Sequence, residues 1–261
     1  MDTPQEKKSR PNLEGKAFLN LHKRVETAIM DYDMIHPGDH VMVGLSGGKD
    51  SSLLLALLAR KKIETTNDFK LSAIFVRMGF KGDDEKLAYL KDYAASLGVP
   101  FHTVDEPILE TFKREKKKPC YLCSRNRRIA IFKHAKTIGA NVIAFGHHRD
   151  DFMQTLFLNI LYGSCIETMK PNNSFFGGEF RVIRPMLYID ETLIAAEAKR
   201  RKLETFPSGC PFQCISERSY VKQLIADAHK RHRRVRQSIF RSLFTVRPEY
   251  LLKPPSRKSM L

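Results

Sequence analysis

Tryptophan is absent from this 261-residue chain, cysteine occurs only five times, and no long apolar run is present. A membrane-spanning helix needs about 18 or more consecutive apolar residues, and no segment approaches that length. The stretch from Met1 to Lys16 is polar and carries both signs of charge, so it lacks the apolar centre of a secretory signal. We therefore expect a cytoplasmic protein with no membrane segment, a setting in which structural disulfides are rare.

Acidic residues are also scarce, because 29 Asp and Glu stand against 45 Lys and Arg and leave a net charge of +16. The basic residues gather at positions 113–118, 125–128, 199–202, 230–234 and 257–258. Some of them would end helices, where cations complement the helix dipole whatever the function. A surplus of this size is better explained by a polyanionic partner, most simply a nucleic acid.

Apolar periodicity predicts helices and strands in alternation along most of the chain. Expected helices cover 13–34, 52–58, 83–97, 125–138, 150–162, 190–202, 216–232 and 235–246, and expected strands cover 40–45, 70–76, 101–104, 141–146 and 180–184. The segments 172–179 and 207–214 are expected to be loops. This alternation predicts an α/β fold with a doubly wound, mostly parallel sheet.

The same pattern predicts how the chain is divided. We expect a helical N-terminal segment over 1–36, a nucleotide-binding α/β domain over 37–205, a cysteine loop with C-terminal helices over 206–252, and a disordered tail over 253–261. The α/β domain would therefore carry helical additions at both ends.

A glycine-rich segment, 46–51, joins the apolar strand 40–45 to the following helix. Its two glycines let the backbone approach an anion, the first-turn amides point at that anion, and Lys49 adds a positive charge. It is not a Walker A loop, because three residues separate Gly44 from Gly48 and Asp50 follows the lysine. A plain glycine-rich turn is the alternative. The segment resembles the PP-loop of the N-type ATP pyrophosphatases, adenine nucleotide alpha hydrolase-like proteins that cut ATP between its α and β phosphates.

A second polar segment, 146–151, follows the expected strand 141–146. In parallel sheets ligands bind beyond the carboxyl ends of the strands, so this segment and the glycine-rich loop are expected to border one crevice. Asp150 and Asp151 open a helix, where the dipole alone favours carboxylates, but their place on this crevice favours a role with magnesium or the substrate for at least one of them. We expect His147 and His148 to form local hydrogen bonds rather than to bind metal.

The cysteines fall into two pairs, Cys120 with Cys123 and Cys210 with Cys214, and Cys165 is expected to serve only in packing. The first pair has basic neighbours, which would hold its thiols as thiolates. Four thiolates could close a structural zinc site. Alternatively, three could hold an iron–sulfur cluster in which one iron lacks a protein ligand. The number of available cysteines is compatible with a zinc site and with an iron–sulfur cluster, and the presence of four slightly favours zinc.

The order of the motifs carries a wider resemblance. The loop 46–51 is followed by a C-x2-C pair with the basic run 124–128, then by 146–159, and then by Val182-Ile183-Arg184-Pro185. This order resembles the tRNA 2-thiocytidine synthetase family over about 13–229. The resemblance implies ATP-dependent replacement of a base oxygen by sulfur at cytidine 32 of tRNA, with a 4Fe–4S cluster and a sulfur donor such as a cysteine desulfurase. It leaves a homodimer open.

Matching motifs imply roles for single residues. The resemblance assigns the ATP phosphates to Ser46, Gly47, Gly48, Lys49, Asp50 and Ser51. It assigns catalysis to Lys49, Asp50, Asp150 and Asp151, with Mg²⁺ near Asp50. The cluster ligands would be Cys120, Cys123 and Cys214, the last because the stretch 223–227 aligns from it. The family commonly has a C-x2-C where this chain has C-x3-C, so Cys210 stays an alternative.

Three basic residues after the first cysteine pair are candidate phosphate contacts. They are Arg125, Arg127 and Arg128, and the first and last of them share a helical face, so part of this trio is expected to be simply solvated. Two other functions compete with tRNA thiolation. One is another adenylating PP-loop enzyme, such as a tRNA-lysidine synthetase or an amidotransferase, with structural zinc. The other is a non-catalytic RNA-binding protein stapled by zinc.

Overall fold

The computed structural model describes residues 13–64, 69–114, 119–207, 209–210 and 217–252. The chain forms two compact units. The first comprises Met1–Phe152 and Met169–Ser216, and the second comprises Met153–Thr168 and Glu217–Leu261. The predicted tail over 253–261 and the cysteine Cys214 lie outside the described residues.

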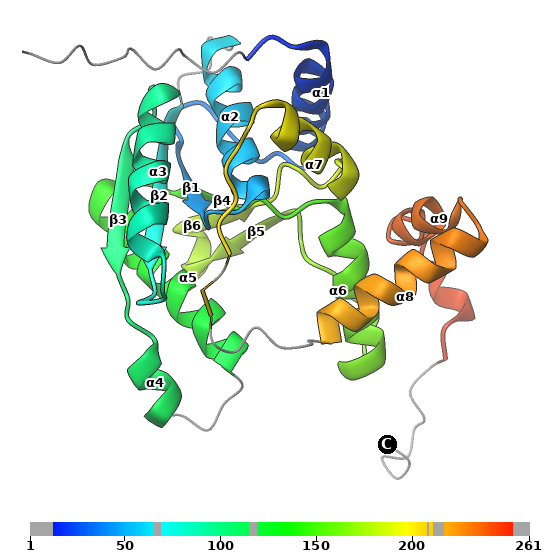
Figure 1. The fold of residues 1–261 in the computed structure, drawn as a ribbon. Coiled ribbons are helices and arrows are strands. Elements are labelled where there is room, and N and C mark those ends of the chain that lie inside the picture. Colours follow the sequence, from blue (N-terminus) through cyan, green and yellow to red (C-terminus); the bar gives the residue numbers. More distant parts are fainter. Residues whose placement is uncertain (1–12, 65–68, 115–118, 208, 211–216, 253–261) are drawn as a thin grey trace, which may run out of the picture. The chain divides into compact units, whose positions relative to one another are not determined.

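A six-stranded sheet forms the centre of the first unit (Figure 1). Its strands are β1 (His40–Leu45), β2 (Lys70–Arg77), β3 (Phe101–Asp105), β4 (Val142–Ala144), β5 (Asn172–Phe175) and β6 (Phe180–Ile183). The order is β3-β2-β1-β4-β6-β5, and every neighbouring pair is parallel except β5 with β6. The predicted doubly wound, mostly parallel sheet is confirmed.

The helices of the first unit connect and cover these strands. They are α1 (Lys16–Asp31), α2 (Lys49–Glu64), α3 (Asp83–Ser96), α4 (Leu109–Arg114), α5 (Pro119–Ile138), the start of α6 (Arg149–Tyr162) and α7 (Glu191–Arg200), with a short 3₁₀ turn, η1 (Phe176–Gly178). Helix α2 contacts the sheet, α1 and α7, which explains its unbroken apolar run 53–58. Burying one such leucine stabilises the fold by roughly 1.5–3 kcal/mol relative to exposure.

Helix α5 packs on a core that includes Met42, Ile74 and Ile143 of three neighbouring strands. It begins at Pro119, earlier than the predicted start at residue 125. Proline is favoured in the first helical position because its missing N–H would have no partner there. The C-x2-C pair therefore lies within the first turns of a helix instead of in a preceding loop.

The segment 172–179, predicted to be a loop, contributes the antiparallel edge strand β5. Its sequence Asn172-Asn173-Ser174 shows no apolar alternation, which is why the pattern missed it. Pairing with β6 provides the backbone hydrogen bonds, and the Asn172 amide donates to the backbone oxygens of Tyr32 and Asp33.

The second unit is helical. It contains the rest of α6, together with α8 (Glu217–Arg231), α9 (Val235–Ser242) and a 3₁₀ turn, η2 (Pro248–Tyr250). Val221, Ile225 and Phe240 are its buried apolar side chains on α8 and α9. Within the described residues, no helix is both long and apolar enough to cross a membrane.

Candidate active site

The glycine-rich loop spans the gap between β1 and α2, and α2 begins at Lys49. Its conformation is fixed by Ser51, whose hydroxyl accepts from the Ser46 N–H and donates to the Gly48 carbonyl, both at 3.1 Å. Gly47 has a φ of +79°, a backbone conformation that favours glycine. The loop amides and the first turn of α2 thus have the local geometry of an anion site.

The segment after β4 lies directly against this loop. A Cβ placed on Gly146 would lie 2.9 Å from both the Asp50 carbonyl carbon and the Ser51 backbone nitrogen. Only a residue without a side chain permits this approach. The two polar segments predicted to border one crevice are therefore brought together, at the point where the chain switches from one side of β1 to the other.

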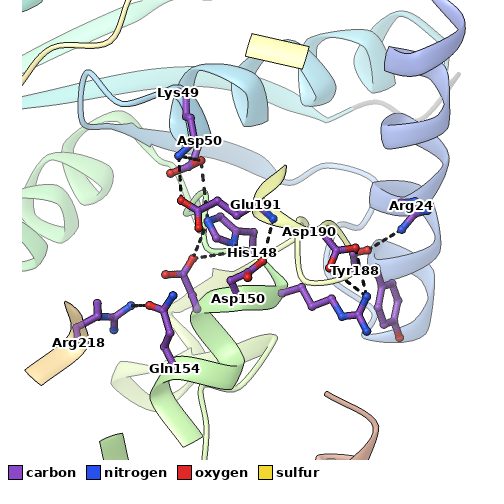
Figure 2. Close-up of polar contacts among 12 residues, drawn as sticks. Arg24, Lys49, Asp50, His148, Asp150, Gln154, Tyr188, Asp190, Glu191 and Arg218 are labelled. Atoms are coloured by element: carbon purple, nitrogen blue, oxygen red, sulfur yellow. Dashed lines mark hydrogen bonds and ion pairs between the residues drawn. The ribbon is translucent and has the colours of Figure 1, made fainter. Parts of the chain in front are cut away.

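Charged side chains surround the first turn of α2, as Figure 2 shows. The Lys49 ammonium lies 3.1 Å from an Asp50 carboxylate oxygen and 3.5 Å from a Glu191 oxygen. Partial burial lowers the pKa of Lys49, but these two carboxylates outweigh it and raise that pKa above its ordinary value. Lys49 is thus held charged, with its ammonium between the loop and the start of α7.

The two predicted aspartates of α6 have different surroundings. Asp150 is buried, and its carboxylate accepts a 2.8 Å hydrogen bond from the Glu191 backbone N–H at the start of α7. Asp151 accepts a 2.9 Å hydrogen bond from the His148 N–H and borders a pocket together with Asp50. Asp151 is therefore the better placed of the two to meet a ligand, a distinction that the sequence did not provide.

The neighbouring histidine connects these acids. The His148 Nε2 lies 3.5 Å from an Asp151 oxygen and 4.0 Å from an Asp50 oxygen. Its Nδ1 lies 3.7 Å from Asp150. The expected local role of His148 fits these contacts. Glu191 and Asp190, at the start of α7, are further members of this polar network. Asp190 is the N-cap residue of α7, and its carboxylate accepts a 3.2 Å hydrogen bond from Arg149.

Two pockets open on the glycine-rich loop. The first, which we call the thiol pocket, has a volume of about 410 Å³. It is lined by Leu45, Ser46, Gly48, Phe75, Val76, Met78, Phe80, Asp83, Lys86, Pro119, Cys120, Cys123, Ser124, Arg127, Phe206 and Cys210. The second, which we call the aspartate pocket, has a volume of about 240 Å³. Its lining includes Ser46, Asp50, Ser51, Arg127, Gly146, His147 and Asp151.

Three described cysteines line the thiol pocket. Cys120 and Cys123 come from the first turns of α5, and Cys210 comes from the segment after α7. Two described residues of that segment lie close to other parts of the fold. The Phe206 N–H donates to the Gly47 carbonyl at 3.0 Å, and a Cβ on Gly209 would lie 2.3 Å from the Lys81 carbonyl oxygen.

The prediction that basic neighbours hold these thiols as thiolates is wrong for Cys123. Burial raises the pKa of the Cys123 thiol above its ordinary value, although Arg127 opposes that shift. The Arg127 guanidinium lies 3.8 Å from the Cys123 sulfur, whereas Arg125 and Arg128 are exposed. Cys165, expected to pack, is exposed as well.

The chemistry of this donor set fits a thiolate-bound metal centre. Soft thiolate ligands select zinc or iron–sulfur clusters, and Cys120, Cys123 and Cys210 share one pocket. Across the part of the chain that the structure describes, no group of three or more His, Cys, Asp or Glu side chains is arranged to hold a metal ion. Cys214 lies outside the described residues, so the choice between Cys210 and Cys214 as third ligand stays a prediction.

Lys86, Asp83 and Phe206 border the thiol pocket but were not singled out from the sequence. No short-range pattern could have found these residues, because all three are distant in sequence from the glycine-rich loop whose pocket they line.

Known proteins that are similar to this chain confirm the resemblance found in its motifs. Residues 19–208 match the PP-loop domain family. A tRNA-cytidine(32) 2-sulfurtransferase of Neisseria meningitidis is 38% identical over 250 residues, which cover 94% of this chain and 78% of that relative. The chain belongs to the tRNA-cytidine(32) 2-sulfurtransferase family. A member from Nitrosospira multiformis is 38% identical over 242 residues, covering 91% of this chain and 80% of the relative.

The fold of this family member is also found in a solved structure. The U34-tRNA thiolase NcsA from Methanococcus maripaludis, determined with its 4Fe–4S cluster, matches with a TM-score of 0.73 and 23% identity. The match covers 87% of this chain and 78% of that protein. At this level of identity the likeness concerns the fold alone.

Proposed function

We propose that this protein transfers sulfur to the cytidine at position 32 of tRNA and consumes ATP in doing so. Its family membership supports the reaction class. One structural observation supports the mechanism above all others. Ser46 and Gly48 of the glycine-rich loop line the same pocket as Cys120, Cys123 and Cys210. Adenylation and sulfur transfer can thus occur on one base without its leaving the site.

The shape and chemistry of the two pockets suggest how ATP binds. Phe75, Val76 and Met78 give the thiol pocket an apolar wall that suits a purine ring. The phosphates would then extend along the loop 46–51, whose amides and Lys49 bind negative charge. Asp50 and Asp151, which border the aspartate pocket, would hold Mg²⁺ beside the phosphates.

The reaction requires the target base to be unstacked from its loop, because chemistry on a base edge needs access to it. The cytosine O2 attacks the α-phosphorus, and pyrophosphate leaves with the electrons of the broken P–O bond. The loop amides and Lys49 stabilise the charge that develops on the phosphates. Sulfur at the sulfide level then attacks C2, and AMP leaves with the electrons of the C2–O2 bond.

Cys120 and Cys123 would hold the family's 4Fe–4S cluster, together with either Cys214 or Cys210. Such a cluster supplies a place at which sulfur at the sulfide level can be held for transfer. Arg127 places a positive charge beside the Cys123 sulfur and favours its thiolate form. We expect the sulfur to come from a donor such as a cysteine desulfurase. A homodimer is a further expectation, which sedimentation analysis would test.

The basic surplus of the chain supports the contact with tRNA. Helix α8 ends in His229, Lys230 and Arg231, and further arginines follow at the start of α9. Cations in such number bind phosphate backbones with a strength that falls as salt rises. We therefore expect tRNA affinity to decrease steeply between low and physiological salt.

Incubation of the anaerobically purified protein with an unmodified tRNA, ATP, Mg²⁺ and sulfide tests this proposal. Digestion to nucleosides and mass spectrometry should detect 2-thiocytidine. A tRNA with uridine at position 32, and a reaction without ATP, are the matched controls and should give none. Iron, sulfide and zinc analysis of the same preparation tests the cofactor. A colourless protein with stoichiometric zinc and no thiolated product would favour the zinc-stapled alternatives.

A further inference from the structure

A buried lysine stands in the wall of the thiol pocket, beside the glycine-rich loop. Lys86 lies in the first turn of α3 and is only 4% exposed. Its aliphatic stem passes close to Gly47, because a Cβ built on that glycine would lie 3.3 Å from the Lys86 Cδ. Its position along the loop is thus set by packing, and both the loop and Lys86 line the thiol pocket.

The charge of Lys86 is balanced by Asp83, at a distance that is long for a charged hydrogen bond. The Lys86 nitrogen lies 3.4 Å from one Asp83 oxygen, whereas such bonds are usually about 2.7–2.9 Å. The other Asp83 oxygen accepts from the backbone N–H groups of Met78 and Phe80, each at 3.0 Å. Asp83 is therefore fixed by the backbone, and its carboxylate helps to hold the Lys86 ammonium at the pocket wall.

Lys49, the lysine of the loop itself, has a different environment. Two carboxylates, Asp50 and Glu191, hold its ammonium. Among the described residues, Lys86 lines the thiol pocket, whereas Lys49 lines neither the thiol pocket nor the aspartate pocket. An anion in the thiol pocket would therefore meet Lys86 on the wall formed by α3.

We propose that Lys86 is a second phosphate-binding cation of the nucleotide site and contacts a phosphate group of ATP in the thiol pocket. This inference rests on the proposed function, in that the pocket takes ATP. A phosphate is favoured over a sulfur anion because the stem of Lys86 runs beside Gly47 of the phosphate loop. A lysine ammonium has three donors, so it can bind phosphate while it keeps its contact with Asp83.

Calorimetric titration of the full-length chain with ATP and with adenosine tests this role. Replacing Lys86 with methionine keeps the length of the stem and removes only the charge. We expect Lys86→Met to weaken ATP binding about 10- to 100-fold, as for a lost hydrogen bond to a charged group, and to leave adenosine binding unchanged. Lys91→Met, which removes an exposed lysine from the same helix, is the matched control and should bind ATP like the wild type.

Lys86→Met removes the cation beside the Asp83 carboxylate and so leaves a buried negative charge. The titrations are therefore repeated on the double variant Asp83→Asn/Lys86→Met, in which residue 83 is neutral as well. Thermal unfolding curves verify that each variant is folded. An ATP affinity of Lys86→Met equal to that of the wild type would overturn the inference, and so would an equal loss for ATP and adenosine. A wild-type protein that binds no ATP would instead contradict the proposed function.

Discussion

Arg127 borders both the thiol pocket and the aspartate pocket. Its guanidinium reaches the Cys123 sulfur at 3.8 Å. Arg127 thus borders both the expected phosphate site and the thiols, and its charge can favour a thiolate although it is not part of the glycine-rich loop. Among the three arginines predicted from the sequence as phosphate contacts, Arg127 is the one that the fold directs to the site.

The cysteines allow a sharp test at the scale of single residues. We expect Cys123→Ser to abolish 2-thiocytidine formation in cells and to leave ATP affinity unchanged, because the glycine-rich loop does not depend on that sulfur. Cys165→Ser, at an exposed position, is the control and should support normal thiolation. Separate Cys210→Ser and Cys214→Ser variants should differ, with loss of iron in only one of them. Normal thiolation by Cys123→Ser would contradict the ligand assignment.

At the scale of elements, the contact between the segment after β4 and the first turn of α2 brings the two halves of the site together. It depends on Gly146, which lies against the backbone of Asp50 and Ser51. Backbone atoms, unlike a flexible side chain, cannot move aside for an added Cβ. The absence of a side chain at Gly146 therefore sets how closely the segment that carries Asp151 approaches the loop.

Gly146→Ala tests this dependence. The added methyl group would overlap backbone atoms at 2.9 Å, so we expect a loss of about 1–3 kcal/mol in the free energy of unfolding, typical of overpacking. Gly48→Ala, whose new Cβ would meet only the Ser46 hydroxyl at 3.3 Å, should cost less. Chemical denaturation of both variants measures the difference. Equal stabilities would show that the loop moves freely to make room.

Several elements could be predicted from the sequence because their signals are local. The apolar strand before the loop 46–51 and the acidic first turn of α3 are examples, since each occupies a continuous stretch. Strand β5 could not be predicted, because its polar residues join the sheet only through pairing with β6. The same limit applies to the site. Motifs identified the loop and the cysteine pairs, whereas Lys86 reaches the thiol pocket only through the packing of α3.

At the scale of the whole molecule, buried and half-buried histidines link stability to pH. Burial lowers the pKa of His22, His40 and His134 below the ordinary value of 6.5. Glu26 and Glu64 oppose this shift at His22 without cancelling it. These imidazoles are spread over α1, β1 and α5, so their neutral forms are part of the packing in several places.

The sign of the pH dependence follows from these directions. Below pH 6.5 the unfolded chain binds protons at these histidines, whereas the folded chain binds fewer. The contribution of the three histidines to the free energy of unfolding is therefore fully present above pH 6.5 and is lost as the pH falls through the lowered pKa values. We expect a lower melting temperature at pH 5.5 than at pH 7.5. The His22→Gln variant should show a smaller difference between the two. A melting temperature that rises on acidification would contradict this account.

The hydrogen bond from the Phe206 N–H to the Gly47 carbonyl connects the two parts of the proposed reaction. Residue 206 lies only four positions before Cys210, which lines the thiol pocket. A cysteine of that pocket is thus close in sequence to a residue bonded to the backbone that we propose to hold the phosphates. A substitution that shifts the glycine-rich loop is therefore expected to impair sulfur transfer as well as ATP binding.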